Sequence, residues 1–223
     1  MPRSTKEKQL ALISTKSVVT ENYRNLRTNI QYASTEKATQ VILISSAKRS
    51  EGKTTTSSNL AVAYANEGKR VMLIDADLRN PALHNVFSIH NTKGLCERLV
   101  DESNTREVIR ETGIAGLSLI TSGIIPINSA ELVSSEAMKS LIDELRNSYD
   151  VIIIDSPPVL LVSDGLALST LCDGVVMVID SKKTEKIHAR KAKMLFEHVN
   201  ARLIGVVLNN VKSSELRKVM NYR

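Results

Sequence analysis

Runs of apolar, mostly β-branched residues alternate along the chain with longer stretches in which apolar and polar residues recur at helical spacing. The apolar runs predict six strands, at 40–45, 70–74, 117–120, 151–154, 174–179 and 203–208. Four of these runs are almost entirely apolar, which is typical of strands buried on both faces. Helical patterns are present at about 54–67, 135–147 and 184–200. This alternation predicts an α/β fold with three layers and a mostly parallel central sheet.

The same order of elements predicts where a ligand binds. Parallel strands are joined by right-handed crossovers, and ligands bind beyond the carboxyl ends of the strands. The chain has 223 residues, of which 42% are hydrophobic, enough for one domain with a full core. We therefore expect a single domain, 1–223, with its site at the carboxyl ends of the strands.

The sequence carries no signal for export or for crossing a membrane. It has no run of about 18 apolar residues, and its basic N-terminus lacks the apolar core of a signal peptide. The two cysteines, Cys96 and Cys172, lack metal-ligand spacing, which argues against a disulfide framework or a zinc site. These features predict a protein of the reducing cytoplasm.

Charge is distributed unevenly along the chain. Lys and Arg outnumber Asp and Glu by nine to three in 1–50 and by eleven to three in 181–223, whereas 51–180 holds ten against eighteen. Basic ends attract nucleic acid, an anionic membrane surface or an acidic protein, or they form solvated helix faces. Aromatic residues make up only 3% of the chain and Trp is absent, so a base-stacking surface is not expected.

A phosphate-binding loop is predicted between the first strand and the first helical pattern. Residues 47–54 fit the Walker A pattern at Gly52, Lys53 and Thr54. In such a loop the backbone N–H groups and the helix N-terminus hold phosphate oxygens, the lysine reaches the β- and γ-phosphates, and the hydroxyl binds Mg²⁺. A chance match is rare, because the loop lies between a predicted strand and a predicted helix and is followed by carboxylates at the expected positions.

The loop departs from the common pattern in two ways. Ala47 replaces the first glycine, and Arg49 and Ser50 stand where many loops have Gly or Pro. Lys48 lies five residues before Lys53, the spacing of the signature lysine in partition and septum-placement ATPases. The other interpretation, a solvated loop lysine, is the one we favour.

Three aspartates complete the predicted site. Asp75 and Asp77 follow the second strand, and Asp155 ends the apolar run 151–154. An Asp at the carboxyl end of a buried strand beside a phosphate loop is placed to hold Mg²⁺. Two carboxylates in one cleft repel each other, so one of them can acquire a raised pKa and act as a base.

These motifs resemble the bacterial tyrosine kinases of capsule and exopolysaccharide systems. The run 75–81 resembles the Walker A′ motif of that family, 149–158 its Walker B motif, and 123–132 the segment between them. The resemblance covers nearly the whole chain. It implies a P-loop NTPase domain that transfers the γ-phosphoryl group of ATP to tyrosine hydroxyls, autophosphorylates, and regulates polysaccharide synthesis and export.

The resemblance also implies a role for each site residue. The expected nucleotide-binding residues are Ser50, Glu51, Gly52, Lys53, Thr54, Thr55 and Asn209. The expected Mg²⁺ ligands are Thr54, Asp77 and Asp155, and the expected catalytic residues are Lys53, Asp75, Asp77 and Asp155. Asp75 would orient or deprotonate the tyrosine. Asn209 or Asn210 contacts the adenine or forms a turn.

Partners follow from the resemblance as well. Glu21, Arg24 and Arg27 resemble the helix through which these kinases pack into rings, so we expect an oligomerisation region (1–38), a nucleotide-binding core (39–211) and a tail (212–223), with a ring-shaped octamer. A separate transmembrane activator, a cognate tyrosine phosphatase and protein substrates are implied, together with attachment to the inner face of the membrane. Tyr222 is the expected self-acceptor.

Two other functions remain open. A partition or septum-placement ATPase would switch on ATP without kinase activity, and Lys48 with the basic ends favours it. A silent ATP-sensing scaffold of a polysaccharide export complex would transfer no phosphate, and the single tail tyrosine, Tyr222, favours that interpretation. The remaining tyrosines, Tyr23, Tyr32, Tyr64 and Tyr149, are interpreted as packing residues.

Overall fold

Seven strands form one sheet at the centre of the molecule. The structure is a computed structural model that describes residues 18–33, 39–101, 104–127 and 129–211. The order across the sheet is β3-β4-β2-β5-β1-β6-β7. The strands are β1 (Val41–Ser46), β2 (Val71–Asp75), β3 (Ile109–Glu111), β4 (Leu117–Ile120), β5 (Val151–Asp155), β6 (Gly174–Asp180) and β7 (Leu203–Asn209). Every neighbouring pair is parallel except β3 and β4, which confirms the predicted mostly parallel sheet.

The six predicted strands are confirmed with ends that differ by one residue or less. β3 was not predicted, because it has three residues, Ile109–Glu111, of which two are charged. It pairs in the antiparallel sense with β4 at one edge of the sheet. A short, charged edge strand carries little hydrophobic signal in the sequence and protects the sheet from pairing with other chains.

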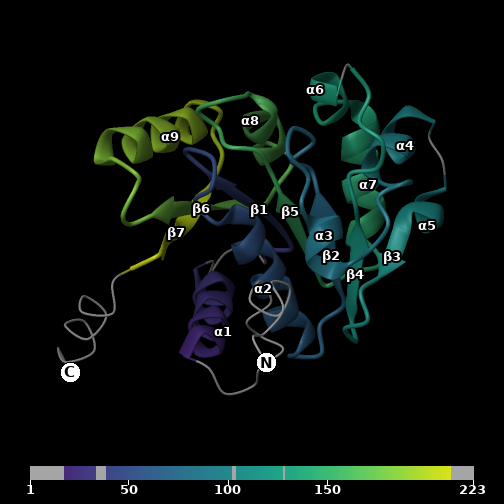
Figure 1. Cartoon of the computed structure of the whole chain (residues 1–223), viewed down its shortest axis with the longest axis horizontal. Helices are drawn as coiled ribbons and strands as arrows, with labels where there is room; N and C mark the ends of the chain where they lie inside the picture. The colour runs from purple at the N-terminus through teal and green to yellow at the C-terminus, as the bar shows by residue number, and fades with distance from the viewer. Residues whose placement is uncertain (1–17, 34–38, 102–103, 128, 212–223) are drawn as a thin grey trace, which may run out of the picture.

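Helices cover both faces of the sheet, as Figure 1 shows. The helices are α1 (Val18–Tyr32), α2 (Lys53–Ala65), α3 (Leu83–Phe87), α4 (Leu95–Val100), α5 (Thr105–Val108), α6 (Ser129–Leu132), α7 (Glu136–Arg146), α8 (Asp164–Ser169) and α9 (Lys186–His198). The three predicted helices correspond to α2, α7 and α9. None of the helices in the described part of the chain is long and apolar enough to cross a membrane.

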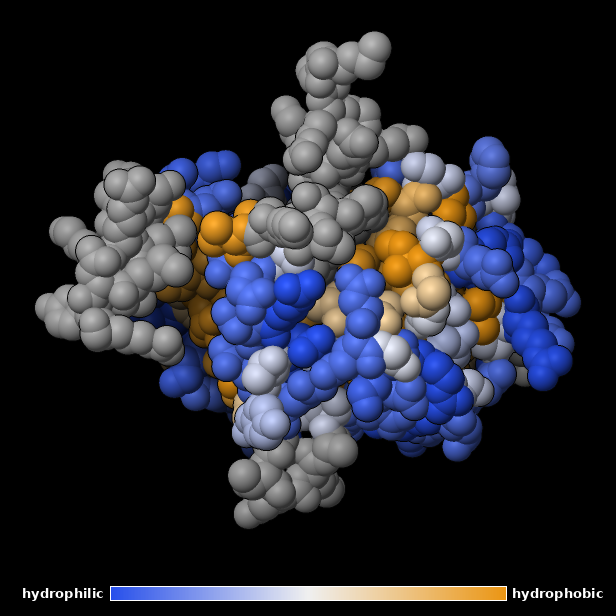
Figure 2. All heavy atoms as spheres, turned by 90° about the horizontal axis from the view of Figure 1, so that it is seen from below, coloured by the Kyte–Doolittle hydropathy of each residue, from blue (hydrophilic) through white to orange (hydrophobic). Residues whose placement is uncertain are grey.

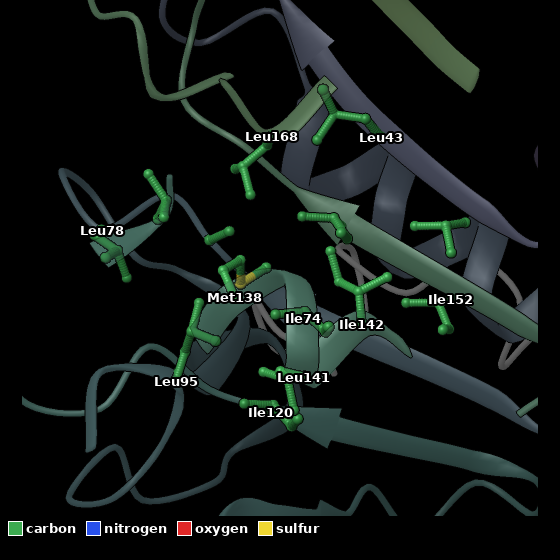
Figure 3. Packing of buried hydrophobic residues seen from close by; sticks show 14 of the residues in the cluster. Leu43, Ile74, Leu78, Leu95, Ile120, Met138, Leu141, Ile142, Ile152 and Leu168 are labelled. Atoms are coloured by element: carbon green, nitrogen blue, oxygen red, sulfur yellow. The ribbon is translucent and has the colours of Figure 1, made fainter. Parts of the chain in front are cut away.

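Alternate residues of the central strands build two hydrophobic cores. Val41 and Leu43 point to the face covered by α4, α7, α8 and α9, whereas Ile42 and Ile44 point to the face covered by α2 and α3. Figure 3 shows the first core, where Met138 and Leu141 of α7 lie against the sheet. Because both faces are buried, the strands need apolar residues at every position.

α1 packs on α2. The Arg27 guanidinium donates to the Ala63 carbonyl at 3.2 Å and pairs with Glu67 at 3.3 Å. Tyr64 is buried at 2% exposure and Tyr23 is partly buried, as predicted. The prediction that Tyr32 packs in the core is wrong: it lies at the end of α1 with 80% exposure. Seen from below Figure 1, the surface is mostly hydrophilic, with separate hydrophobic areas (Figure 2).

Candidate active site

The predicted phosphate loop joins β1 to α2, and its geometry requires glycine at position 52. Gly52 has φ of 97°, a left-handed conformation that only glycine adopts without strain. A Cβ atom at this position would lie 2.1 Å from Nδ2 of Asn209. That Nδ2 donates to the Glu51 carbonyl at 3.0 Å, so the end of β7 holds the loop from one side.

The side chain of Glu51 fastens the loop from within. It is 2% exposed, and its Oε2 accepts from the Lys48 backbone N–H at 2.8 Å. Its Oε1 accepts from the hydroxyl of Thr184, in the turn between β6 and α9. That turn is itself held by Asp180, which accepts from the amides of Lys182 and Lys183. Glu51 was expected in the loop, but the contact of its carboxylate with Thr184 was not predicted from the sequence.

Lys53 begins α2 and its ammonium faces Asp77. The Nζ–Oδ2 distance is 3.6 Å, and both side chains are less than a tenth exposed. Asp77 also accepts from the Asn80 N–H at 3.1 Å, which fixes the turn after β2. The attraction between two opposite charges at this separation offsets part of the desolvation cost of burying them.

Thr54 and Asp155 form the second contact across the site. The Thr54 hydroxyl donates to Oδ2 of Asp155 at 2.7 Å, whereas Oδ1 of Asp155 is buried without a partner among the described residues. Burial raises the pKa of Asp155 to about 7, although Lys53 and the Thr54 hydroxyl oppose the rise. This carboxyl therefore changes its charge near neutral pH.

Asp75 lies beside Asp155 on the neighbouring strand. Its Oδ2 accepts from the amides of Ala82 and Leu83 at 3.0 and 2.9 Å, while its Oδ1 is buried without a partner among the described residues. Burial, followed by the charge of Asp155, holds the pKa of Asp75 well above its usual range. The ionised form is disfavoured for both Asp75 and Asp155. Both carboxyl groups therefore ionise at the same time only when a cation is bound beside them.

The residues present fit Mg²⁺ bound together with a nucleotide. They offer hard oxygen donors: the Thr54 hydroxyl, the unpartnered Oδ1 of Asp155 and the carboxylate of Asp77. Within the described ranges no three His, Cys, Asp or Glu side chains form a metal cluster. Mg²⁺ commonly takes one or two carboxylates and completes its shell with phosphates and water, so this donor set is sufficient.

A cleft of about 130 Å³ opens in front of the Lys53–Asp77 pair. Its lining includes both charged or polar residues and apolar residues. The lining residues are Arg49, Ser50, Lys53, Asp77, Arg79, Asn80, Pro157, Pro158, Leu161 and Val162. Asp77 reaches this cleft, whereas Asp75 lies behind it with no exposed surface.

Most of the predicted site residues come together at the carboxyl ends of β1, β2 and β5. Thr55 is exposed on the first turn of α2, and its carbonyl accepts from the Asn59 side chain. Both ends of the Asn209 side-chain amide are engaged, since its Oδ1 accepts from the Asn210 N–H. The adenine contact of Asn209 or Asn210 stays a prediction.

The predicted oligomerisation residues lie on α1, outside this site. Glu21 and Arg24 form an exposed ion pair at 3.1 Å, but Arg27 already binds α2 of its own chain. Their role between subunits stays a prediction. Tyr222, the predicted phosphoacceptor, lies outside the described residues.

Comparison with known proteins gives one family for nearly the whole chain. A family model described as an AAA domain matches residues 39–200. The tyrosine-protein kinase YwqD of Bacillus subtilis is 43% identical over 206 residues, which cover 92% of this chain and 87% of the relative. The tyrosine-protein kinase CpsD of Streptococcus agalactiae is 36% identical over 197 residues, covering 87% and 85%.

Solved structures agree with these relatives. The chimerical protein CapA2B2 superposes with a TM-score of 0.89 at 38% identity, covering 92% of this chain and 91% of the other. The kinase domain of the Escherichia coli tyrosine kinase ETK gives 0.86 at 29% identity, covering 92% and 82%. The septum site-determining protein MinD of Pyrococcus horikoshii, solved with Mg-ADP, gives 0.67 at 21% identity and supports the P-loop NTPase fold alone.

Proposed function

The chain belongs to the family of bacterial tyrosine kinases, and we propose that it transfers the γ-phosphoryl group of ATP to tyrosine hydroxyls of proteins and regulates capsule or exopolysaccharide synthesis. One observation carries the proposal. Lys53 and Thr54, at the first turn of α2, each contact an aspartate from a different strand end, Asp77 and Asp155. A phosphate loop joined to two strand-end carboxylates in this way holds a nucleotide and a divalent cation.

The loop and α2 bind the phosphates of ATP. The backbone N–H groups around Gly52 and the N-terminus of α2 attract anions, and Lys53 adds a full positive charge. Asp77 keeps Lys53 oriented until the phosphates arrive. Ser50, Glu51 and Thr55 complete the loop, and the Glu51 carboxylate holds it closed against Thr184.

Thr54, Asp77 and Asp155 supply the oxygen atoms for Mg²⁺. The cation would neutralise negative charge on the phosphates during transfer. Asp155 has the free oxygen for this task, and a bound cation stabilises its ionised form despite its burial. The Thr54 hydroxyl keeps Asp155 in place.

Two carboxylates, Asp75 and Asp77, are candidates for orienting the tyrosine hydroxyl. Asp77 lines the cleft, but Lys53 already occupies its Oδ2. Asp75 has an unpartnered Oδ1 and a raised pKa, which favours a proton acceptor once a cation is bound. We assign the orienting or proton-accepting role to Asp75.

Partners belong to the same proposal. A transmembrane activator would dock its cytoplasmic tail on the kinase, and similarity to a protein described as chimerical is compatible with a second polypeptide acting here. Glu21 and Arg24 are exposed on α1 and available to a neighbouring subunit of a ring. The basic ends hold the protein near the anionic inner membrane surface, and a phosphatase reverses phosphorylation at Tyr222 and on substrates.

A switch ATPase is the second candidate, because the fold also matches MinD. In that function Lys48 would reach a neighbouring nucleotide, whereas here its backbone is held by Glu51 and its side chain stays partly exposed. Formation of phosphotyrosine separates the two functions, as it does for a silent scaffold.

The decisive experiment incubates the purified protein with Mg²⁺ and ATP, with and without an activator-tail peptide. Mass spectrometry then searches for phosphotyrosine at Tyr222 and on added proteins. We expect phosphotyrosine in the wild type and a loss of about a thousandfold in Lys53→Met, since the loop lysine stabilises the transferred charge. ATP hydrolysis without phosphotyrosine on any protein would instead identify a switch ATPase.

A further inference from the structure

Two arginines line the cleft together with the Lys53–Asp77 pair. Arg49 comes from the phosphate loop and Arg79 from the loop after β2. Arg79 pairs with Asp164 at 3.3 Å, yet its side chain stays 40% exposed while that of Asp164 is 3% exposed. Part of the Arg79 side chain is therefore accessible to a ligand in the cleft.

Arg49 has no charged partner in the described part of the chain. It is exposed, and its guanidinium makes no ion pair or hydrogen bond with the described residues. Asp77, the carboxylate of the lining, is already compensated by Lys53. Arg49 thus brings positive charge to the cleft that no described carboxylate neutralises. This charge is additional to the Lys53 ammonium, which meets the phosphates of ATP.

The cleft also has apolar lining residues. Pro157 and Pro158, after β5, are buried, whereas Leu161 is 52% exposed. Leu161 is therefore an accessible apolar side chain against which an aromatic ring can pack. Positive charge and an exposed apolar side chain line the same cleft.

We propose that this cleft selects acceptor tyrosines flanked by carboxylates. The tyrosine ring packs against Leu161, and acidic side chains before or after it pair with Arg49 and Arg79. The inference rests on the kinase function proposed above and names its substrate class.

The charges of the chain's own tail oppose this preference. Residues 212–223 hold four Lys and Arg and one Glu, and Arg223 directly follows Tyr222. A tyrosine in such a context brings positive charge to Arg49 and Arg79, and like charges repel at this range. Tyr222 is then the slower acceptor, and acidic tyrosine segments on other proteins are the faster ones.

The test compares three peptides that share one central tyrosine and differ only in four flanking residues: Asp, Ser or Lys. Binding of fluorescein-labelled peptides is measured with Mg²⁺ and a non-hydrolysable ATP analogue, and phosphorylation is measured with ATP. We expect the Asp peptide to exceed the Lys peptide by at least about tenfold in both affinity and kcat/KM, and the ratio to fall as salt rises.

Arg49→Gln should lower that ratio to about threefold or less, and Arg49→Gln/Arg79→Gln should abolish it. Arg106→Gln, an exposed arginine on α5, removes the same charge elsewhere and controls for the net charge of the protein. Equal binding of the Asp and Lys peptides by the wild type would overturn the inference while leaving the kinase function intact. A higher KM for ATP in Arg49→Gln with an unchanged peptide ratio would also overturn it, by assigning Arg49 to the nucleotide.

Phosphotyrosine on none of the peptides, with ATP still hydrolysed, would overturn the kinase function. In that case equal peptide binding would overturn the acidic preference as well, whereas a retained preference for the Asp peptide would support the cleft as a site for acidic segments. The binding arm therefore separates the two failures.

Discussion

Asp75 and Asp155 lie opposite each other in the parallel register of β2 and β5, and each carries one buried carboxylate oxygen without a described partner. The pairing follows from strand order, since both residues end their strands at the same edge of the sheet. Two buried acids side by side destabilise the nucleotide-free protein when both are ionised. Binding of a divalent cation relieves this destabilisation.

The nucleotide-free protein should therefore be less stable at pH 8 than at pH 5. The pKa of Asp155 is about 7 in the folded protein and 3.8 ordinarily, so between these values the unfolded chain releases a proton that the folded chain keeps. Stability falls as pH rises through this window and levels off above it. Relative to Asp155→Asn, the wild type should lose on the order of 2 to 3 kcal/mol of unfolding free energy between pH 5 and pH 8 in EDTA.

Asp150→Asn is the matched control, because the shift at Asp150 has the opposite direction. A hydrogen bond from Arg70 lowers the pKa of Asp150 to about 2, so its contribution is present at both pH values and is lost only in stronger acid. Urea unfolding at both pH values provides the measurement. If the unfolding free energy of the wild type changes between pH 5 and pH 8 by the same amount as that of Asp155→Asn, the pKa of Asp155 is not raised in the folded protein.

Asp75 should control the pH dependence of phosphoryl transfer. Its raised pKa means that the base form grows with pH, so the rate should rise with pH when Mg²⁺ and ATP are present. Asp75→Asn should lower kcat by about a hundredfold or more and flatten this rise. Asp77→Asn should keep the rise and mainly raise the KM for ATP, because Lys53 loses its partner. A steep pH profile surviving in Asp75→Asn would move the role to Asp77.

Gly52→Ala should disrupt the phosphate loop for two reasons that can be separated. The left-handed backbone costs about 1 to 2 kcal/mol for a residue with a Cβ atom, and the new Cβ would meet Nδ2 of Asn209 at 2.1 Å. Gly68→Ala is the matched control: Gly68 has φ of 82° and nothing within 4 Å of its Cβ position.

We expect Gly52→Ala to lower the unfolding free energy by at least about 1 kcal/mol more than Gly68→Ala, and to weaken ADP binding measured by calorimetry. Gly52→Ala/Asn209→Ala should regain part of the ADP affinity, because it removes the close contact and leaves the backbone strain. Equal losses in the two single variants would exclude a role for the Asn209 contact.

The sequence was sufficient to predict the sheet and the nucleotide end of the site. Apolar runs bounded by polar residues define β1, β2 and β5 closely, because strands buried on both faces tolerate few polar residues. Gly52, Lys53 and Thr54 have fixed spacing within one loop, so their proximity is a local property. Contacts with Asp77 and Asp155 follow from the rule that parallel strands end at one edge.

Other features depend on distant parts of the chain and leave no local pattern. The side chain of Glu51 meets Thr184, 133 positions later, and nothing in either segment indicates the pairing. Arg27 pairs with Glu67, just after α2, a contact within the chain that the sequence did not indicate, since a charge pattern on a helix does not identify its partner. Tyr32 was expected to be buried, yet α1 ends there and exposes it.

The pairing of Glu51 with Thr184 is therefore open to a direct energetic test. Glu51→Gln and Thr184→Val each remove one side of the contact, and the double variant removes both. We expect a coupling free energy of about 1 to 2 kcal/mol in urea unfolding, because the hydrogen bond is partly buried and its acceptor is a carboxyl group that is 2% exposed.

The exposed pair Lys193–Glu197 on α9, 3.1 Å apart, provides the comparison, with an expected coupling below about 0.5 kcal/mol. Glu51→Gln should also weaken ADP binding by about tenfold, because the Lys48 amide loses a charged acceptor and the loop loses its link to the β6–α9 turn. A coupling no larger than that of Lys193–Glu197 would mean that the loop holds its shape through Gly52 and Asn209 alone.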